Sequence, residues 1–240
     1  MKSSQQALKS RGFITEEDIL PIERLSEKEL IELLSGPAPQ KRTAAVKIIA
    51  AFKKENHIPL LCELLKTEKK LYTKIALAEA LAGYGKAAVT FLTQLLGKIG
   101  NNQHKKPAAI DLNKPSFPLP RDIAARIIIR IGPEALDELE KTAYGNDRSQ
   151  ITEAIDAIGH IAYNYGDRRS ENILFELLKK HDGDELIKWK IVRAFQAFSS
   201  NKVKIYLLNI MDETENEILI SEAGRSLNVM EKLCNKAFTA

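Results

Sequence analysis

Charged side chains recur at regular spacing in this 240-residue chain, and they are the residues best suited to hold a partner. The series consists of Lys47, Glu79, Arg126, Asp156, Arg193 and Arg225. From the second member to the fifth, the sign of the charge alternates. Such a row either forms ion pairs within the protein, at about 0–1 kcal/mol for each exposed pair, or forms a charged groove that binds another molecule. The sequence leaves both interpretations open.

A repeated eight-residue sequence motif contains these charged residues. Each is the third residue of an octet with the order apolar, apolar, X, small, apolar, small, X, apolar, and the clearest copies are Leu77–Tyr84 and Ala154–Ile161. Leucine pairs 31 residues apart, such as Leu33-Leu34 and Leu64-Leu65, precede the octets. A period of about thirty residues is typical of stacked helical hairpins. Each hairpin has a first helix, A, that ends near the leucine pair and a second helix, B, that carries the octet.

The fold predicted from this pattern is an all-α solenoid of about six helical hairpins. Residues 26–231 form the solenoid, residues 1–25 an N-terminal helical cap and residues 232–240 a C-terminal tail that frays. The octets of the second and third hairpins are 47 residues apart instead of 30–37, which requires an insertion at residues 100–120.

Helix-terminal signals support these boundaries. Ser26–Glu29 has the form of a capping box at the start of the first A helix, and Thr214–Glu217 has the same form before the last B helix. Gly85, Gly132 and Gly166 follow B helices, where a residue with positive φ is favoured.

The octets resemble the HEAT repeat, in the short variety also found in phycobilisome-lyase-like proteins. The best matches are Leu77–Gly85, Ala124–Gly132 and Ala154–Ile161, and the resemblance covers residues 26–231. The first, fifth and sixth copies depart from the motif, because they lack the closing glycine or do not clearly keep small residues at the small positions of the octet. The resemblance implies an α-α superhelix whose B helices line a concave side. It implies protein binding for most such proteins, and chromophore-lyase or base-removing activity for a few, so the fold does not choose the function.

The predicted binding surface lies on the concave side of the B helices. Its candidate residues are Arg126, Arg130, Asp156, His160, Trp189, Lys190, Arg193 and Arg225. Trp189, the only tryptophan, lies between two lysines; it either anchors a partner or packs on a neighbouring hairpin. His160 is interpreted as an ordinary hydrogen-bonded residue and not as an acid or base.

The insertion supplies a second group of candidates, Asn102, Gln103, His104 and Phe117. Because Phe117 and Leu119 stand among prolines, we expect an ordered strap that packs on the concave side. Long loops in compact arrays are functional or disordered, and a tolerated surface insertion is the alternative.

Composition and motifs exclude several classes. No apolar run of about 18 residues predicts a membrane span, and the two cysteines show no disulfide or zinc spacing. The sequence contains no catalytic or phosphate-binding motif in a suitable context, so we expect no metal and no cofactor and favour a binding protein over an enzyme. The polar N-terminus favours a cytoplasmic location. Residues 36–120 carry 14 basic and 5 acidic side chains, net +9, which either attracts an acidic partner or only solubilises helix faces.

The leading functional prediction is a non-catalytic scaffold that binds a protein or peptide with its concave face. The first alternative is nucleic-acid binding, including glycosylase-like action framed by Asp156 and Trp189. The second alternative is a subunit similar to bilin lyases, and its only support is the resemblance of the fold. The sequence does not determine the oligomeric state.

Overall fold

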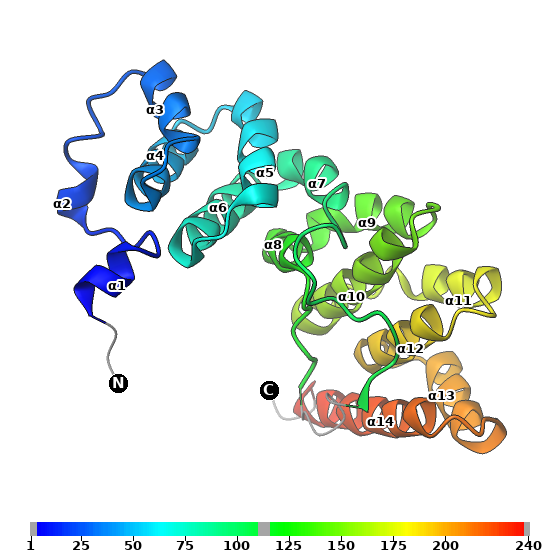
Figure 1. The fold of residues 1–240 in the computed structure, drawn as a ribbon. Coiled ribbons are helices and arrows are strands. Elements are labelled where there is room, and N and C mark those ends of the chain that lie inside the picture. Colours follow the sequence, from blue (N-terminus) through cyan, green and yellow to red (C-terminus); the bar gives the residue numbers. More distant parts are fainter. Residues whose placement is uncertain (1–3, 110–115, 238–240) are drawn as a thin grey trace. The chain divides into compact units, whose positions relative to one another are not determined.

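The computed structural model describes residues 4–109 and 116–237, which form helices and no strand (Figure 1). Contacts divide the chain into two compact units, Met1–Leu95 (unit 1) and Leu96–Ala240 (unit 2). The α-helices of unit 1 are α1 (Gln5–Lys9), α2 (Glu16–Ile19), α3 (Glu27–Leu34), α4 (Pro39–Ala51), α5 (Ile58–Thr67), α6 (Leu71–Gly83) and α7 (Lys86–Thr93). Those of unit 2 are α8 (Ile123–Ile131), α9 (Leu136–Ala143), α10 (Arg148–Tyr165), α11 (Glu171–Lys180), α12 (Glu185–Ala194), α13 (Asn201–Glu213) and α14 (Glu217–Ala237).

Consecutive helices pair as hairpins in both units. In unit 1, α3 packs on α4 and α5 on α6, and in unit 2 the pairs are α9 with α10, α11 with α12, and α13 with α14. The second helices also pack on one another: α4 on α6 in unit 1, and α10 on α8 and α12, followed by α12 on α14, in unit 2. All six octets begin on these second helices, and the fifth, residues 191–198, continues past the end of α12, so the prediction of an all-α solenoid of helical hairpins is confirmed.

Small residues let neighbouring B helices approach closely. Gly159 of α10 is the clearest case, because a Cβ atom there would lie 2.8 Å from the Cβ atom of Ala194 and 2.9 Å from the ring of Phe117. Ala154 and Ala157 on the same helix are fully buried. The small octet positions therefore set the distance between α10 and α12, as helix packing requires.

Most helix-terminal signals act as predicted, with one correction. Ser26 and Glu29 form the capping box of α3, and Gly85, Gly132 and Gly166 all have positive φ. At α14 the prediction of a capping box headed by Thr214 is wrong. The side chain of Asn216 accepts hydrogen bonds from the backbone of Ile218 and Leu219, so Asn216 is the N-cap. Asparagine is as good an N-cap as threonine or better, and it stands one residue before the helix.

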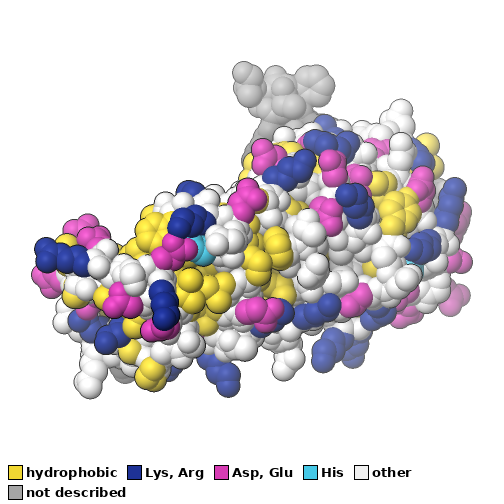
Figure 2. Space-filling view, turned by 90° about the horizontal axis from the view of Figure 1, so that it is seen from above, with side chains coloured by type: hydrophobic (Ala, Val, Ile, Leu, Met, Phe, Trp, Pro, Cys, Tyr) yellow, Lys and Arg dark blue, Asp and Glu magenta, His cyan; other side chains and the backbone are white. Residues whose placement is uncertain are grey.

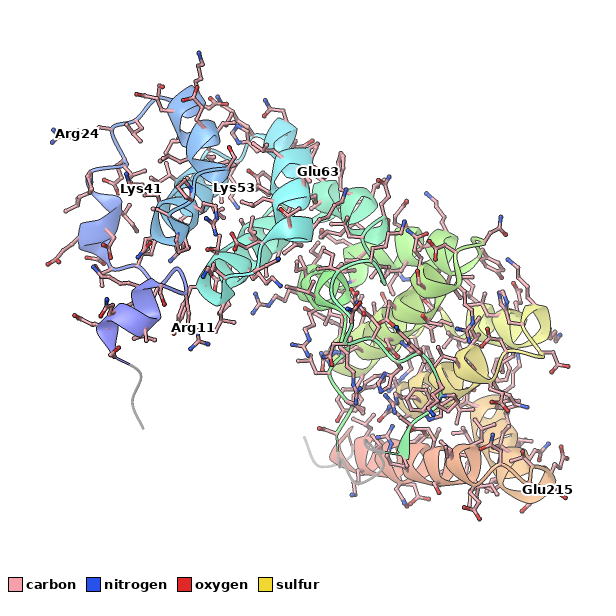
Figure 3. The ribbon with its side chains drawn as sticks, in the orientation of Figure 1. Arg11, Arg24, Lys41, Lys53, Glu63 and Glu215 are labelled. Atoms are coloured by element: carbon pink, nitrogen blue, oxygen red, sulfur yellow. The ribbon has the colours of Figure 1, made fainter. Side chains whose placement is uncertain are left out.

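Lys53 takes the place of the closing glycine that the first octet lacks. It follows α4 with φ of 54°, the only non-glycine residue with positive φ in the described part of the chain. Its Nζ donates a 2.7 Å hydrogen bond to the carbonyl oxygen of Gly83 at the end of α6 (Figure 3). The bond between neighbouring hairpins offsets the cost of a left-handed conformation at a residue with a Cβ atom.

The segment before α3 touches the second hairpin of unit 1. The backbone N–H of Tyr72 donates to the carbonyl oxygen of Arg11 at 3.1 Å, and the rings of Phe13 and Tyr72 meet edge to face at 5.1 Å. At the other end, α14 continues through Ala237, and residues 238–240 of the predicted tail lie outside the described residues. The boundaries of the cap, solenoid and tail stay predictions.

The exposed surface carries charges of both signs. On the face drawn in Figure 2, Lys and Arg side chains are interspersed with Asp and Glu, and hydrophobic side chains gather between them. Within the described residues, no helix is both long enough and apolar enough to cross a membrane.

Candidate functional site

The B-helix surface of unit 2 is the side of α8, α10, α12 and α14 that carries the predicted binding residues. The segment between α7 and α8, residues 94–122, is called the strap below, and its described parts run alongside α10 and α12 (Figure 1). Its residues 110–115 lie outside the described residues. The strap contacts Trp189 and His160 among the predicted residues.

Lys190 is the centre of a buried ion network between α10 and α12. Its Nζ donates 2.7 Å hydrogen bonds to Oε1 of Glu153 and to Oδ2 of Asp156, and the Lys190 side chain has no exposed surface. Burial works to lower the pKa of Lys190, but the attraction of Asp156 and Glu153 outweighs it and raises the pKa. Burial, with the repulsion of Asp156, raises the pKa of Glu153 to about 7. The three groups therefore form one coupled system.

Glu222 of α14 is the centre of a second buried network. Its Oε2 accepts a 3.1 Å hydrogen bond from Nη2 of Arg193, and its Oε1 accepts a 2.8 Å bond from Nε of Arg225. Arg225 also donates a 3.1 Å bond to Oε1 of Gln196. Arg193, Arg225 and Glu222 are all buried. Asp156, Arg193 and Arg225, three of the four members of the charged row in unit 2, therefore form internal ion pairs across three hairpins.

Trp189 lies inside the protein, between the strap and the second network. The His104 ring of the strap meets the indole edge to face at 4.9 Å, and the guanidinium of Arg193 lies 3.9 Å above the ring centroid. Trp189 is fully buried. Burial lowers the pKa of His104 to about 4, so the imidazole is neutral at pH 7.

Phe117 attaches the other described arm of the strap to α10. Its ring lies 5.2 Å from that of His160 and 5.6 Å from that of Tyr163, and it is buried over Gly159. Nδ1 of His160 is 2.7 Å from the amide nitrogen of Asn164, and burial lowers the pKa of His160. Phe117 is thus buried against α10, whereas Leu119, expected to pack with it, is 52% exposed.

Asp122 fixes the base of the strap. Its Oδ1 caps α8 by accepting a 2.9 Å bond from the backbone of Ala125, and its Oδ2 accepts bonds from Gln103 at 2.9 Å and from the backbone of Gly97 at 3.1 Å. Gln103 is thereby bound within the strap, whereas Asn102 is exposed.

Two of the predicted concave residues are exposed. Arg126 and Arg130 lie one turn apart on α8, and neither forms an ion pair within the described residues. Nε of Arg126 donates a 2.5 Å hydrogen bond to the carbonyl oxygen of Pro120, which places it beside Leu119. In unit 1, Lys47 and Glu79 are also exposed and have no ion-pair partner in the described part of the chain.

The sequence analysis missed three carboxylates that complete these networks. Glu153 precedes Asp156 by three residues, and Glu222 precedes Arg225 by three, so each shares a helix face with a predicted residue. Asp122 stands before a helical apolar run, which is the pattern of an N-cap. The positions of these carboxylates could be predicted from helix periodicity and capping patterns. The residues that pair with Glu153 and Glu222 could not, because they lie on neighbouring hairpins about thirty residues away.

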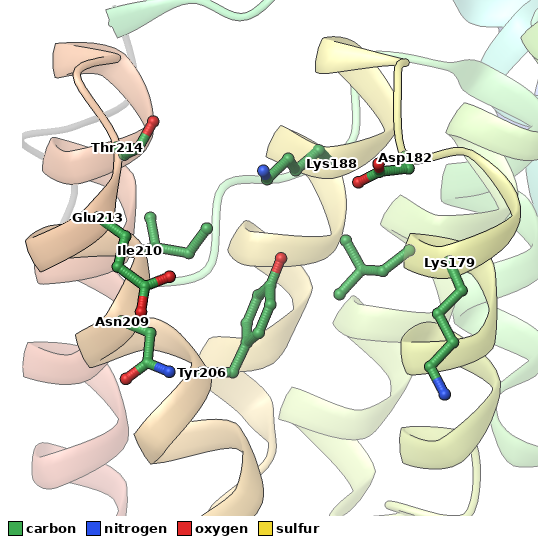
Figure 4. Close-up of a pocket in the computed structure, with 9 residues that line it drawn as sticks. Lys179, Asp182, Lys188, Tyr206, Asn209, Ile210, Glu213 and Thr214 are labelled. Atoms are coloured by element: carbon green, nitrogen blue, oxygen red, sulfur yellow. The ribbon is translucent and has the colours of Figure 1, made fainter.

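Each unit contains a pocket. In unit 2, a pocket of about 660 Å³ lies between α11, α12 and α13, and its lining includes Lys188, Tyr206 and Glu213 (Figure 4). Burial raises the pKa of Tyr206 to about 12. In unit 1, a pocket of about 820 Å³ lies beside the Arg42–Glu68 ion pair. Among the described residues no group of three His, Cys, Asp or Glu side chains is placed to hold a metal ion.

Stacked helical hairpins with paired B helices define the α-solenoid class of repeat proteins. Residues 27–101 match the family model of HEAT repeats. No curated protein matches the chain.

Solved structures show a weak similarity to this chain. An engineered protein is 18% identical, with 86% of this chain and 96% of that chain covered and a TM-score of 0.40. A designed armadillo repeat protein in complex with the peptide (KR)4 is 19% identical, with 94% and 92% covered and a TM-score of 0.36.

Proposed function

We propose that this protein is a non-catalytic scaffold that binds a protein or peptide through its B-helix surface. The observation that carries the proposal is the strap. The B helices of unit 2 hold an extended segment through ring contacts, with Phe117 on α10 and His104 on Trp189 of α12. A surface that already binds an extended chain of this protein has the chemistry to bind one from another protein.

The accessible part of this surface lies where the strap meets α8. Arg126 and Arg130 present two exposed guanidinium groups, and Leu119 is exposed next to Pro120. Guanidinium groups bind carboxylates with paired hydrogen bonds. The proposed partner is therefore an acidic segment with an apolar side chain.

In unit 1, the same face of α6 also offers apolar contacts. Leu71 and Ile75, one turn apart, are 43% and 41% exposed. Isolated exposed leucines are common, but a pair on one helix face near Glu79 supports contact with a partner.

Nucleic-acid binding has less support. Lys190, Arg193 and Arg225 are buried in ion pairs and cannot reach phosphate groups in this arrangement. Asp156 and Trp189, the pair considered for glycosylase-like action, are buried beneath the strap, so no base can stack on the indole. Among the described residues, no feature favours a bilin-lyase role. A cytoplasmic location is part of the proposal, supported by the free, buried thiol of Cys62.

The test is affinity capture of the tagged chain from lysate of its own organism, with and without nuclease, followed by binding of the recovered partner to purified variants. The double variant Arg126→Glu, Arg130→Glu should weaken partner binding about tenfold or more, because like charges then oppose the partner's carboxylates. The matched control is Arg11→Glu, Arg24→Glu, which reverses two exposed arginines of unit 1 (Figure 3). Equal binding by both double variants contradicts the proposal, and loss of every partner after nuclease treatment favours nucleic acid instead.

A further inference from the structure

One face of α13 exposes three large apolar side chains in a row. Ile205, Leu208 and Met211 are 58%, 43% and 38% exposed, and their spacing of three residues places them on one side of the helix. The other large exposed apolar residues of unit 2 among those described, Leu119, Tyr144 and Tyr165, lie on separate elements. The α13 row is therefore a patch and not scattered exposure.

This face points away from the neighbouring hairpin. Tyr206 meets Phe175 of α11 edge to face at 5.7 Å, and Nζ of Lys202 lies 3.9 Å above the Phe175 ring. Tyr206, Asn209 and Glu213 line the pocket between α11 and α13 (Figure 4). The apolar row lies on the opposite side of the helix, where a further hairpin would pack in a continuing stack.

The charges that flank the row are arranged symmetrically. Lys204 precedes Leu208 by four residues and Asp212 follows it by four, while Ile205 and Met211 lie three residues to either side. On a helix these five positions share one face. Lys204 and Asp212 are both exposed, and neither forms an ion pair within the described residues.

We propose that this face binds a second copy of the same chain, with the two α13 helices antiparallel about a two-fold axis through Leu208. Leu208 then packs on the partner's Leu208, and Ile205 on the partner's Met211. Lys204 pairs with the partner's Asp212, and Asp212 with the partner's Lys204. A two-fold interface requires a surface complementary to itself, and this order of charged and apolar residues meets that requirement in the antiparallel orientation alone. In a parallel orientation, Lys204 would face a lysine and Asp212 an aspartate.

The first test measures the mass of the purified full chain against concentration by sedimentation equilibrium. Because a single-helix interface is small, we expect a reversible dimer with a dissociation constant on the order of 10–100 µM. Leu208→Glu places two carboxylates on the axis and should leave a monomer at every concentration. The matched control Leu20→Glu changes an exposed leucine of unit 1 and should dimerise like the wild type. A wild-type chain that stays monomeric at about 500 µM, or equal dimerisation by both variants, overturns the proposal.

The second test exchanges the charges. Lys204→Glu and Asp212→Lys should each weaken dimerisation about tenfold, because each creates two like-charge pairs across the axis. The double variant Lys204→Glu, Asp212→Lys restores opposite charges and should return to within about threefold of the wild type. Failure of the double variant to recover, with helix content unchanged by circular dichroism, would place the interface elsewhere.

Discussion

The charged residues of the B helices act first on the protein that contains them. Lys190 pairs with two carboxylates, and Glu222 pairs with two arginines, and all of these residues are buried. Burial makes each such network costly to break, because removal of one member leaves an uncompensated charge in a medium of low polarity. Several residues predicted to bind a partner therefore hold α10, α12 and α14 together within the protein.

Replacement of Lys190 tests this conclusion. Lys190→Met keeps an unbranched side chain but leaves Glu153 and Asp156 without their counter-charge, so we expect a loss of about 3–5 kcal/mol in the free energy of unfolding, measured by urea denaturation. The control Lys141→Met removes an exposed lysine paired with Glu138 and should change stability by less than about 0.5 kcal/mol. A loss below about 1 kcal/mol for Lys190→Met would show that the network contributes little.

Glu153 should make stability depend on pH near neutrality. Its pKa is about 7 in the folded protein and near 4.5 in the unfolded chain, so between these values the folded state holds a proton that the unfolded state has lost. The stabilising contribution is complete below pH 4.5 and is lost as the pH rises through 7.

The comparison is between the wild type and Glu153→Gln, by urea unfolding at several pH values from 5 to 7.5. The wild-type free energy of unfolding should fall relative to the variant as the pH rises. His104, with its pKa lowered to about 4, has the opposite effect between pH 4 and its ordinary value of 6.5, but it is present in both proteins and cancels in the difference. Parallel pH profiles would contradict the prediction.

At the scale of the elements, a close helix contact and the strap depend on the same residue. Gly159 lets α10 approach Ala194 of α12 and makes room for the ring of Phe117. His104 and Phe117 then attach the described parts of the strap to α12 and α10.

Gly159→Ala should therefore destabilise unit 2. A methyl group would meet a backbone atom of α12 at 2.9 Å, which a side-chain rotation cannot relieve, so we expect a loss of about 1–3 kcal/mol despite the better helix propensity of alanine. Gly183→Ala is the matched control, since nothing lies within 4 Å of a Cβ atom there. Thermal unfolding of the two variants checks this, and equal midpoints would show that α10 and α12 can move apart at little cost.

At the scale of the whole molecule, contacts gather within two units. Repeat proteins draw stability from contacts between neighbouring hairpins, so a local change acts first on its own surroundings. The division at residue 95 lies just after α7, where the long strap begins.

Amide hydrogen exchange followed by mass spectrometry should show this division. Lys190→Met should speed exchange in α10, α12 and α14 and leave α3 to α6 unchanged. Leu81→Ala, which creates a cavity at a fully buried leucine of unit 1, should do the reverse. If either variant accelerated exchange equally throughout, the two units would unfold as one cooperative body.

The sequence by itself determined the helices. A period of about thirty residues, the octets and the glycines after the B helices predicted where the second helix of each hairpin lies. This is possible because helix periodicity and helix caps depend on a few adjacent residues. Even the missing glycine of the first copy was visible, although the sequence did not show that Lys53 would adopt its conformation.

Only the tertiary structure decided what the candidate residues do. Arg126 and Arg130 are exposed in the structure. The buried candidates are Asp156, Trp189, Lys190, Arg193 and Arg225. The difference depends on partners 29 to 37 residues away and on the path of a strap with no periodic signal. Local sequence fixes which face of a helix a residue occupies, but the burial of that face depends on which distant segment packs against it.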